Sequence, residues 1–522
     1  MPNIFSQPGK AAGQKLQLAA QAIDRAFPLK RKHYAELHYA VRDLSRLLTT
    51  ERGQKQAYWS SPRFLSAYLR YFLPWNLLRL SRLLPALPLD LPAGGRVLDL
   101  GSGPLTVPLA LWLSRRDLRM LDLRIVCSDT APRPMELGRD IYRLLVSDNG
   151  ETESVPGAKS REKAAQATGQ ADGTEAGAAS ESRESVDAPR NAGASSARGA
   201  HDARETGARA KLPWHIVLAR DPLELAIRKT KEKVHLITAA NVLNELPTPR
   251  QESLEEKLGS IFASMHRILE PGGQILLIEP GTRLGGKLVA LMRRLALEKG
   301  YTVLAPCTHQ EACPFLTERD EDADEDGADD DFMGSAPSRK GMAERNAKQA
   351  WQPRPSGWCH FSHDAEGAWP ELLRLSAAAD LPKERLSLSF VLLRKPLPGE
   401  NSAAGRKTDA RAAKSAPFAS SGQSVRTGQT GEFAKSAQPA KNGRTIADGR
   451  QSSLPAPGEY MDARVISDII KVPGKGICRY VCTRAGLGLL RDAAELDSGA
   501  EVGVTRHKNG GIDPKTGALD LV

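Results

Sequence analysis

Long apolar runs are absent from this 522-residue sequence. No stretch reaches the roughly 20 consecutive apolar residues that a membrane-spanning helix requires, so we expect no membrane partner. The first 30 residues also lack the apolar core of a secretory signal peptide. These absences together predict a cytoplasmic protein.

Cysteine is scarce, because only six are spread over the whole chain, and none forms the C-x-x-C knuckle of a zinc ribbon. Without a secretory signal, reduced thiols are expected rather than disulfides. Four thiolates gathered from distant positions can hold a [4Fe–4S] cluster or a zinc ion. The alternative is buried free cysteines that act as small hydrophobic side chains, and spacing alone leaves these possibilities open.

Aliphatic side chains are almost missing from three long segments, which are rich in Ala, Gly, Ser and charged residues. Such segments bury too little apolar surface to offset the entropy of ordering, so we expect them to be disordered. Four regions are predicted: a helical region (1–90), an α/β domain (91–396), a disordered linker (397–458) and a small C-terminal β extension (459–522). Within the α/β domain we predict disordered insertions at 150–211 and 318–350 and a cysteine-bearing metal-site segment at 305–361.

The charge of the chain is unevenly distributed. The formal net charge is +11, but the run 318–331 holds ten acidic residues and one arginine, which leaves about +20 on the rest. A body this basic attracts the phosphate backbone of nucleic acid. Solubility and basic tails are the alternative explanation.

The most informative stretch is V-L-D-L-G-S-G-P at 97–104, an apolar strand that turns through glycines into an apolar helix at 105–113. Gly101 and Gly103 allow the backbone to approach a ligand closely, and the free N–H groups of the helix point back at the same place. Leu105 stands where a dinucleotide fingerprint has its third glycine, which argues against NAD and narrows the predicted pocket. The pattern fits S-adenosylmethionine better, although a plain strand–turn–helix corner would look similar.

Further strands continue the α/β alternation, and polar residues follow several of them. Asp129 closes the second strand, where an acid can accept hydrogen bonds from both ribose hydroxyls of a nucleotide. Asp221 follows the third strand and is placed to meet an adenine amine or to cap the next helix. The predicted strands are 97–100, 123–129, 214–218, 234–238, 274–280 (after an L-E-P-G-G turn at 269–273) and 386–393. The predicted cofactor-binding residues are Asp99, Gly101, Gly103, Asp129, Asp221 and Asn241.

Helical spacing of apolar residues covers 10–50, and an aromatic- and arginine-rich helix is predicted over 68–80. The latter segment has the composition of a helix that lies at a membrane interface. A helix with an apolar stripe more commonly faces a core, so we predict that it caps the sheet and shows its arginines to solvent. Arg70, Arg79 and Arg82 are then expected to face RNA.

Five parallel strands in this rhythm resemble the Rossmann-like sheet of a class I S-adenosylmethionine-dependent methyltransferase. The motifs L-D-L-G-S-G-P, A-A-N-V-L-N-E-L, L-E-P-G-G-Q-I-L-L-I-E-P-G-T, A-P-C-x-H-x-x-x-C-P and W-C-H-F together resemble the Rsm22 family of methyltransferase-like proteins of the small ribosomal subunit, in its bacterial form. The resemblance implies a [4Fe–4S] cluster on Cys307, Cys313, Cys359 and Cys482, with Cys478 as the alternative fourth ligand and Cys127 in the core.

The family resemblance implies an iron–sulfur factor that binds S-adenosylmethionine and rRNA on the small ribosomal subunit, and that is monomeric away from it. We expect methyl transfer, yet no catalytic residue can be named. The segment Asn241–Asn244 lacks an N-P-P-Y-type clamp, and no cysteine stands where a carbon-methylating enzyme would place its nucleophile. Two alternatives stay open: an inactive assembly or structural factor, and an active rRNA methyltransferase with a structural zinc site.

Overall fold

The structure is a computed structural model that describes residues 2–7, 10–49, 58–148, 212–246, 253–316, 357–400 and 455–522. The predicted insertions 150–211 and 318–350, and most of the predicted linker 397–458, lie outside the described residues. Among the helices of the described ranges, none is long and apolar enough to cross a bilayer.

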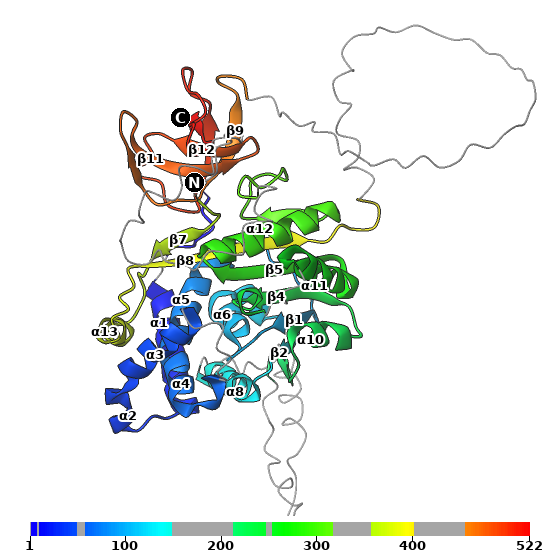
Figure 1. The fold of residues 1–522 in the computed structure, drawn as a ribbon. Coiled ribbons are helices and arrows are strands. Elements are labelled where there is room, and N and C mark those ends of the chain that lie inside the picture. The colour runs from blue at the N-terminus through cyan, green and yellow to red at the C-terminus, as the bar shows by residue number, and fades with distance from the viewer. Residues whose placement is uncertain are drawn as a thin grey trace, which may run out of the picture.

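A twisted eight-stranded sheet forms the centre of the molecule, with strand order β3-β2-β1-β4-β5-β8-β6 and β7 paired to β8 (Figure 1). Strands β1 to β5 are parallel to one another, whereas β8 runs antiparallel to both β5 and β6. This mixed sheet confirms the predicted α/β class. The strands are β1 Arg96–Leu100, β2 Arg124–Ser128, β3 His215–Ala219, β4 Val234–Ala240, β5 Leu269–Pro280, β6 Thr302–Ala305, β7 Phe361–Asp364 and β8 Arg385–Arg394.

Strand β5 begins five residues earlier than the sequence predicted. The L-E-P-G-G segment belongs to the strand as an irregularity, because the register against β4 shifts between Val234 and Leu236. Gly272 takes a positive φ of 75°, and the pair Gly272–Gly273 exchanges two backbone hydrogen bonds with Lys395, at 3.1 and 2.9 Å. Glycine permits this conformation, so the expected turn becomes a bulge within the ladder.

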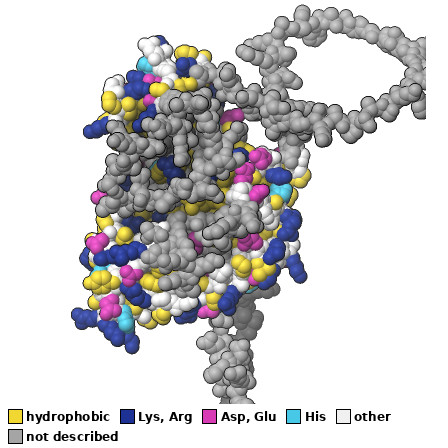
Figure 2. Space-filling view, in the orientation of Figure 1, with side chains coloured by type: hydrophobic (Ala, Val, Ile, Leu, Met, Phe, Trp, Pro, Cys, Tyr) yellow, Lys and Arg dark blue, Asp and Glu magenta, His cyan; other side chains and the backbone are white. Residues whose placement is uncertain are grey.

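Helices cover both faces of the sheet, since successive strand residues point to opposite sides. Val97 joins the core under the N-terminal helices, whereas Leu98 joins the core on the opposite face. The first layer contains α1 Lys10–Ala26, α2 Arg31–Ala35, α3 Leu37–Thr49, α4 Pro62–Ala67, a π-helical turn Tyr68–Phe72, α5 Leu73–Leu83, α6 Thr106–Ser114, α7 Arg116–Arg119 and α8 Pro132–Asp148. The second layer contains α10 Leu223–Lys229, α11 Leu254–Ile268 and α12 Arg283–Glu298, while α13 Pro370–Ala378 packs at the edge of the cap. At the far end of the cap, α2 is exposed along its length (Figures 1 and 2).

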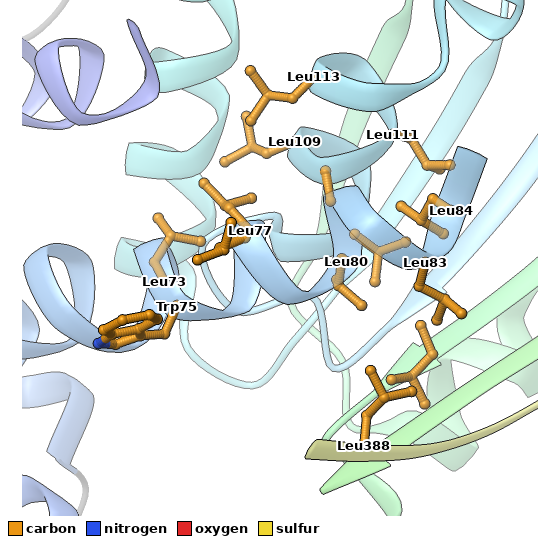
Figure 3. Close-up of a cluster of buried hydrophobic side chains, with 14 of the residues drawn as sticks. Leu73, Trp75, Leu77, Leu80, Leu83, Leu84, Leu109, Leu111, Leu113 and Leu388 are labelled. Atoms are coloured by element: carbon orange, nitrogen blue, oxygen red, sulfur yellow. The ribbon is translucent and has the colours of Figure 1, made fainter. Parts of the chain in front are cut away.

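The aromatic- and arginine-rich segment packs as a cap, as predicted. Leu73, Leu77 and Leu80 of α5 lie against Leu109 and neighbouring leucines of α6 (Figure 3). The alternative of a membrane-interface helix is therefore wrong, because the apolar face is buried in the core.

The expectation that the arginines of this segment face solvent or RNA is wrong. Arg70 is only 8% exposed and Arg82 only 6%. Arg70 Nη2 donates to the carbonyl of Phe27 at 2.5 Å, and Arg82 Nε donates to the carbonyl of Ser6 at 2.7 Å. The Nε of Arg79 is buried as well. The guanidinium groups of Arg70 and Arg82 hold chain segments in place, which helical periodicity alone does not reveal.

The C-terminal unit is a second sheet of order β13-β9-β11-β12-β14, with β10 paired to β11. Thr505 and Val522 exchange two backbone hydrogen bonds, at 2.9 and 3.0 Å, so β13 and β14 close this sheet on itself. The predicted small β extension is thereby confirmed. Its strands are β9 Tyr460–Val465, β10 Ile470–Val472, β11 Gly476–Thr483, β12 Gly486–Leu490, β13 Glu501–Thr505 and β14 Leu519–Leu521.

The N-terminal residues bridge this unit to the helical cap. Ile4 N–H donates to the carbonyl of Gly499 at 3.2 Å, and Glu501 N–H donates to the carbonyl of Pro2 at 2.9 Å. Ser6 N–H donates to the carbonyl of Arg82 at 2.8 Å. Residues 2–6 therefore connect residues 499–501 of the C-terminal unit to α5.

Candidate functional site

The glycine turn after β1 depends on backbone conformations that favour glycine. Gly101 and Gly103 have φ of 64° and 50°, and Leu105, at the N-cap of α6, has φ of 59°. A Cβ on Gly101 would overlap Val242, and one on Gly103 would lie 3.7 Å from Trp59. The outer face of the turn is thus lined by these two side chains. Leu105 itself is fully buried in the core, so its bulk is accommodated away from the turn.

Asp99 supports the turn from inside. It is buried, its Oδ1 accepts a 2.5 Å hydrogen bond from Thr238 Oγ1, and its carbonyl accepts one from Ser102 Oγ at 2.9 Å. Burial raises the pKa of this carboxyl group to about 6. Its position identifies Asp99 as a residue that holds the turn and not as one that faces the opening.

Asp129 lies directly beside the turn, whereas Asp221 is drawn away from it. Asp129 Oδ2 accepts from Gly103 N–H at 2.9 Å, and Oδ1 accepts from Ala131 N–H at 3.0 Å. Asp221 Oδ1 forms a 2.5 Å ion pair with Lys229 of α10. It does not cap that helix, whose N-cap is Pro222 without a side-chain bond. Asp221 instead lines a cavity of about 370 Å³ under α10.

The loop after β4 contains Asn241, which was predicted to bind the cofactor. The same loop contacts Glu279, a residue that was not among the predicted site residues. Asn241 has a positive φ of 54°, and its buried Oδ1 has no hydrogen-bond partner among the described residues. Glu279, at the end of β5, accepts from Leu243 N–H at 3.0 Å. The Asn244 amide, oriented to donate, reaches Glu279 Oε2 at 3.0 Å and the carbonyl of Asn241 at 3.2 Å.

Burial raises the pKa of Glu279 to about 8, so this side chain holds its proton at neutral pH. The signal for Glu279 was available in the sequence. It is an acid at the end of the apolar run I-L-L-I-E-P, and the carboxyl ends of parallel strands meet at one edge.

An aromatic wall from the helical cap stands across from the two acidic loops. The rings of Tyr58, Trp59 and Tyr68 follow one another with centroid distances of 4.7 and 4.5 Å. The pKa of the Tyr68 hydroxyl lies well above its ordinary value. Burial is the main cause, and the nearby carboxylates of Glu245 and Asp129 contribute less. The turn, the β4 loop and this wall thus lie close together.

The four predicted metal-ligating cysteines line one small cavity. Cys307 and Cys313 lie in the loop after β6, Cys359 precedes β7, and Cys482 lies on β11 of the C-terminal unit. Across the described ranges, no three Cys, His, Asp or Glu side chains are grouped closely enough to bind a single metal ion as they stand. The structure therefore gathers the thiols without forming a compact one-ion site.

The two remaining cysteines lie elsewhere. Cys478 is buried on β11, with Sγ 3.5 Å from the carbonyl of Lys475, and is not part of the cavity lining. Cys127 is fully buried in β2, in the core as predicted.

Two buried arginines hold the cysteine loop. Arg293 Nη2 donates to the carbonyls of His309 and Glu311 at 3.1 and 2.7 Å, and Arg464 Nε donates to the carbonyl of Pro306 at 2.8 Å. Burial and the Arg293 charge lower the pKa of His309 to about 4, which keeps its imidazole neutral. His309 Nε2 lies 3.4 Å from Cys482 Sγ.

The donor chemistry of the cavity is suited to a soft metal centre, since it offers four sulfurs and no carboxylate. Burial, with a contribution from Cys307, raises the pKa of the Cys313 thiol to about 11. Such thiols keep their protons until a metal displaces them.

The strand order of the sheet reverses between β1 and β4, and the glycine turn lies at this point. In an open α/β sheet, such a reversal creates a crevice for a ligand at the carboxyl ends of the strands.

Residues 185–323 match the family model of Rsm22, described as the mitochondrial small ribosomal subunit Rsm22. The resemblance that the motifs indicate is therefore confirmed over residues 185–323. A search of curated proteins found no match.

Solved structures similar to this chain are methyltransferases and related proteins. TrmN from Thermus thermophilus is 16% identical, with 50% of this chain and 47% of that chain covered and a TM-score of 0.21. This chain therefore spans about half the length of TrmN. Aeropyrum pernix fibrillarin, solved with natively bound S-adenosyl-L-methionine, is 15% identical over 44% and 72% of the two chains, with a TM-score of 0.21. TM-scores this low do not define a fold, so the fold of this chain is described from the strand order of its sheet.

Proposed function

We propose that this protein is a methyltransferase-like factor of the small ribosomal subunit that binds S-adenosylmethionine at the glycine turn. The observation that carries the proposal is the junction of Gly103 and Asp129 at the strand-order switch, within a chain whose residues 185–323 match the Rsm22 family model. An acid beside such a turn accepts hydrogen bonds from a ribose. The open sheet, in which the strand order reverses between β1 and β4, also supports a nucleotide-like cofactor at the carboxyl ends of these strands.

Calorimetry with S-adenosylmethionine tests the site. Asp129→Asn is expected to weaken binding about tenfold or more, because an amide replaces a charged acceptor of hydrogen bonds. Asp140→Asn, which removes an exposed carboxylate on α8, serves as the matched control and is expected to bind like wild type. Gly101 is unsuitable for this test, since any side chain there overlaps Val242. Absence of binding by folded wild-type protein contradicts the proposal.

For turnover, the bound cofactor supplies an electrophilic methyl group, and the protein must align a nucleophile with it. The unpartnered Oδ1 of Asn241 and the protonated Glu279 are the polar groups available beside the turn. They are suited to holding an N–H or carbonyl group of a substrate.

A second function, binding or assembly without turnover, is favoured by a specific observation. Val242 and Trp59 lie against the two glycines of the turn, so the protein's own side chains cover the face that a cofactor would approach. Transfer of a labelled methyl group to rRNA of the small subunit distinguishes the two functions, and cofactor binding without transfer supports the second.

The cysteine cavity is proposed to hold a [4Fe–4S] cluster on Cys307, Cys313, Cys359 and Cys482. A single zinc ion, with Zn–S bonds of about 2.3 Å, requires four closely grouped sulfurs. Four cysteine thiolates are the ligand set of a [4Fe–4S] cluster, and the cavity brings together four cysteines from separate segments of the chain. A cytoplasmic location and a monomeric state away from the ribosome stay predictions.

A further inference from the structure

We propose that the exposed end of the helical cap is an RNA-binding surface that engages an unpaired segment of RNA. This basic tip consists of Lys30, Arg31, Lys32 and His33, together with the neighbouring ring of Tyr39. The inference rests on the proposed association with the small ribosomal subunit. The residues of the tip take the RNA-facing role that the sequence had assigned to Arg70, Arg79 and Arg82.

The tip is cationic and open to solvent. Every residue from 30 to 36 is exposed, and α2 contains no buried residue. In the described part of the chain, no ion pair within 4.0 Å involves Lys30, Arg31 or Lys32, in contrast to most arginines of the cap, such as Arg25 and Arg63. Figure 2 shows Lys, Arg and His side chains gathered at the end of the molecule where Figure 1 places α2.

An exposed aromatic ring lies on α3, the helix that follows α2 in the chain. Tyr39 at the start of α3 is 53% exposed, its ring lies 3.9 Å from that of His38, and the guanidinium of Arg42 lies 5.9 Å from its centroid. Exposed aromatic faces between cations stack on nucleobases whatever their sequence, and only an unpaired base offers its face. This combination favours single-stranded or looped RNA over an acidic protein.

A membrane surface fits the tip poorly. An interfacial helix needs a broad apolar face opposite its basic one. The sequence of α2, R-K-H-Y-A, has only Tyr34 as a large apolar side chain.

Contacts made by the buried Arg70 hold the tip in place before any ligand binds. Arg70 Nη2 bonds the carbonyl of Phe27 at 2.5 Å and pairs with Asp24 at 2.9 Å, while Arg70 Nε donates to Tyr34 Oη at 3.3 Å. Tyr34 Oη in turn donates to Asp24 Oδ1 at 2.7 Å. Arg70 therefore fixes the turn between α1 and α2, so little ordering of the backbone is needed when RNA binds.

The test uses the full chain, purified small ribosomal subunits and a labelled single-stranded RNA oligonucleotide of mixed sequence. The triple variant Lys30→Gln/Arg31→Gln/Lys32→Gln is expected to weaken both interactions at least about tenfold. It is also expected to make the salt dependence shallower by about 0.7 for each phosphate that the variant no longer neutralises. Tyr39→Ala is expected to weaken binding to the oligonucleotide about tenfold with an unchanged salt slope, because stacking is not ionic.

The matched control is Lys471→Gln/Lys508→Gln/Lys515→Gln, which removes the same charge from three exposed lysines of the C-terminal unit. Equal thermal melting of all variants establishes that the fold is intact. If the two triple variants bind RNA equally well, or if the tip instead binds vesicles of anionic lipid and no RNA, the inference is overturned. If wild type ignores ribosomal subunits but binds the oligonucleotide through the tip, the proposed ribosome association fails while the surface stands.

Discussion

Protein purified without oxygen is expected to be brown and to carry about four iron atoms per chain, the content of one cysteine-ligated [4Fe–4S] cluster. Cys482→Ser is expected to lose nearly all of this iron and the associated visible absorption. The reason is that Cys482 is the thiol that the C-terminal unit contributes to the cavity, which three thiols of the α/β domain also line.

Cys478→Ser is the matched control, because it changes a cysteine on the same strand whose Sγ faces the carbonyl of Lys475. It is expected to keep its iron. One zinc per chain with no iron would contradict the cluster. Loss of iron from the Cys478 variant but not from the Cys482 variant would exchange the two assignments.

Glu279→Gln is expected to become progressively more stable than wild type as the pH rises from 5 to 8. In the folded protein, burial raises the pKa of Glu279 to about 8, whereas the ordinary value for glutamate is about 4.3. Between these two values the unfolded chain has released a proton that the folded chain still holds. The free energy of unfolding therefore falls as the pH rises through this window. The neutral amide of the variant does not titrate and escapes this loss, which is on the order of 2–4 kcal/mol by pH 8.

The comparison between variants is essential, because buried histidines act in the opposite direction. Burial lowers the pKa of His309 and His363 to about 4, so they destabilise the fold as the pH falls below about 6.5. These contributions are common to both proteins and cancel in the difference. Urea unfolding at pH 5, 6, 7 and 8 gives the measurement, with Glu366→Gln as an exposed control. Parallel pH profiles for wild type and Glu279→Gln would show that Glu279 is ionised in the folded protein.

The sequence predicts the parts of this structure that depend on local patterns. Apolar runs that end at Asp99 and Asp129, with glycines at the turn, locate the strands and one edge of the sheet. The cysteine motifs named four thiols that the fold does bring to one cavity. In both cases the residues that matter lie within a short window or a recognisable motif.

The remainder could not be predicted because it depends on contacts between distant segments. The burial of Arg82 depends on Ser6, and that of Arg70 on Phe27 and Asp24, none of which lies on the same helix. Trp59 reaches Gly103 only because the helical cap folds over the turn. Periodicity describes one helix at a time and gives no information about what covers its polar side chains.

The bridge formed by residues 2–6 has a consequence for the order in which the chain folds. Synthesis proceeds from the N-terminus, and domains generally fold as they emerge. The carbonyl of Pro2 accepts a hydrogen bond from Glu501 N–H and the N–H of Ile4 donates to the carbonyl of Gly499, so residues 2–4 are translated long before the partners that they bind. Contacts of such high sequence separation form slowly. Docking of the C-terminal unit onto the helical cap therefore cannot be completed until residues 499–501 have been translated, and residues 2–6 reach their final place only after that step.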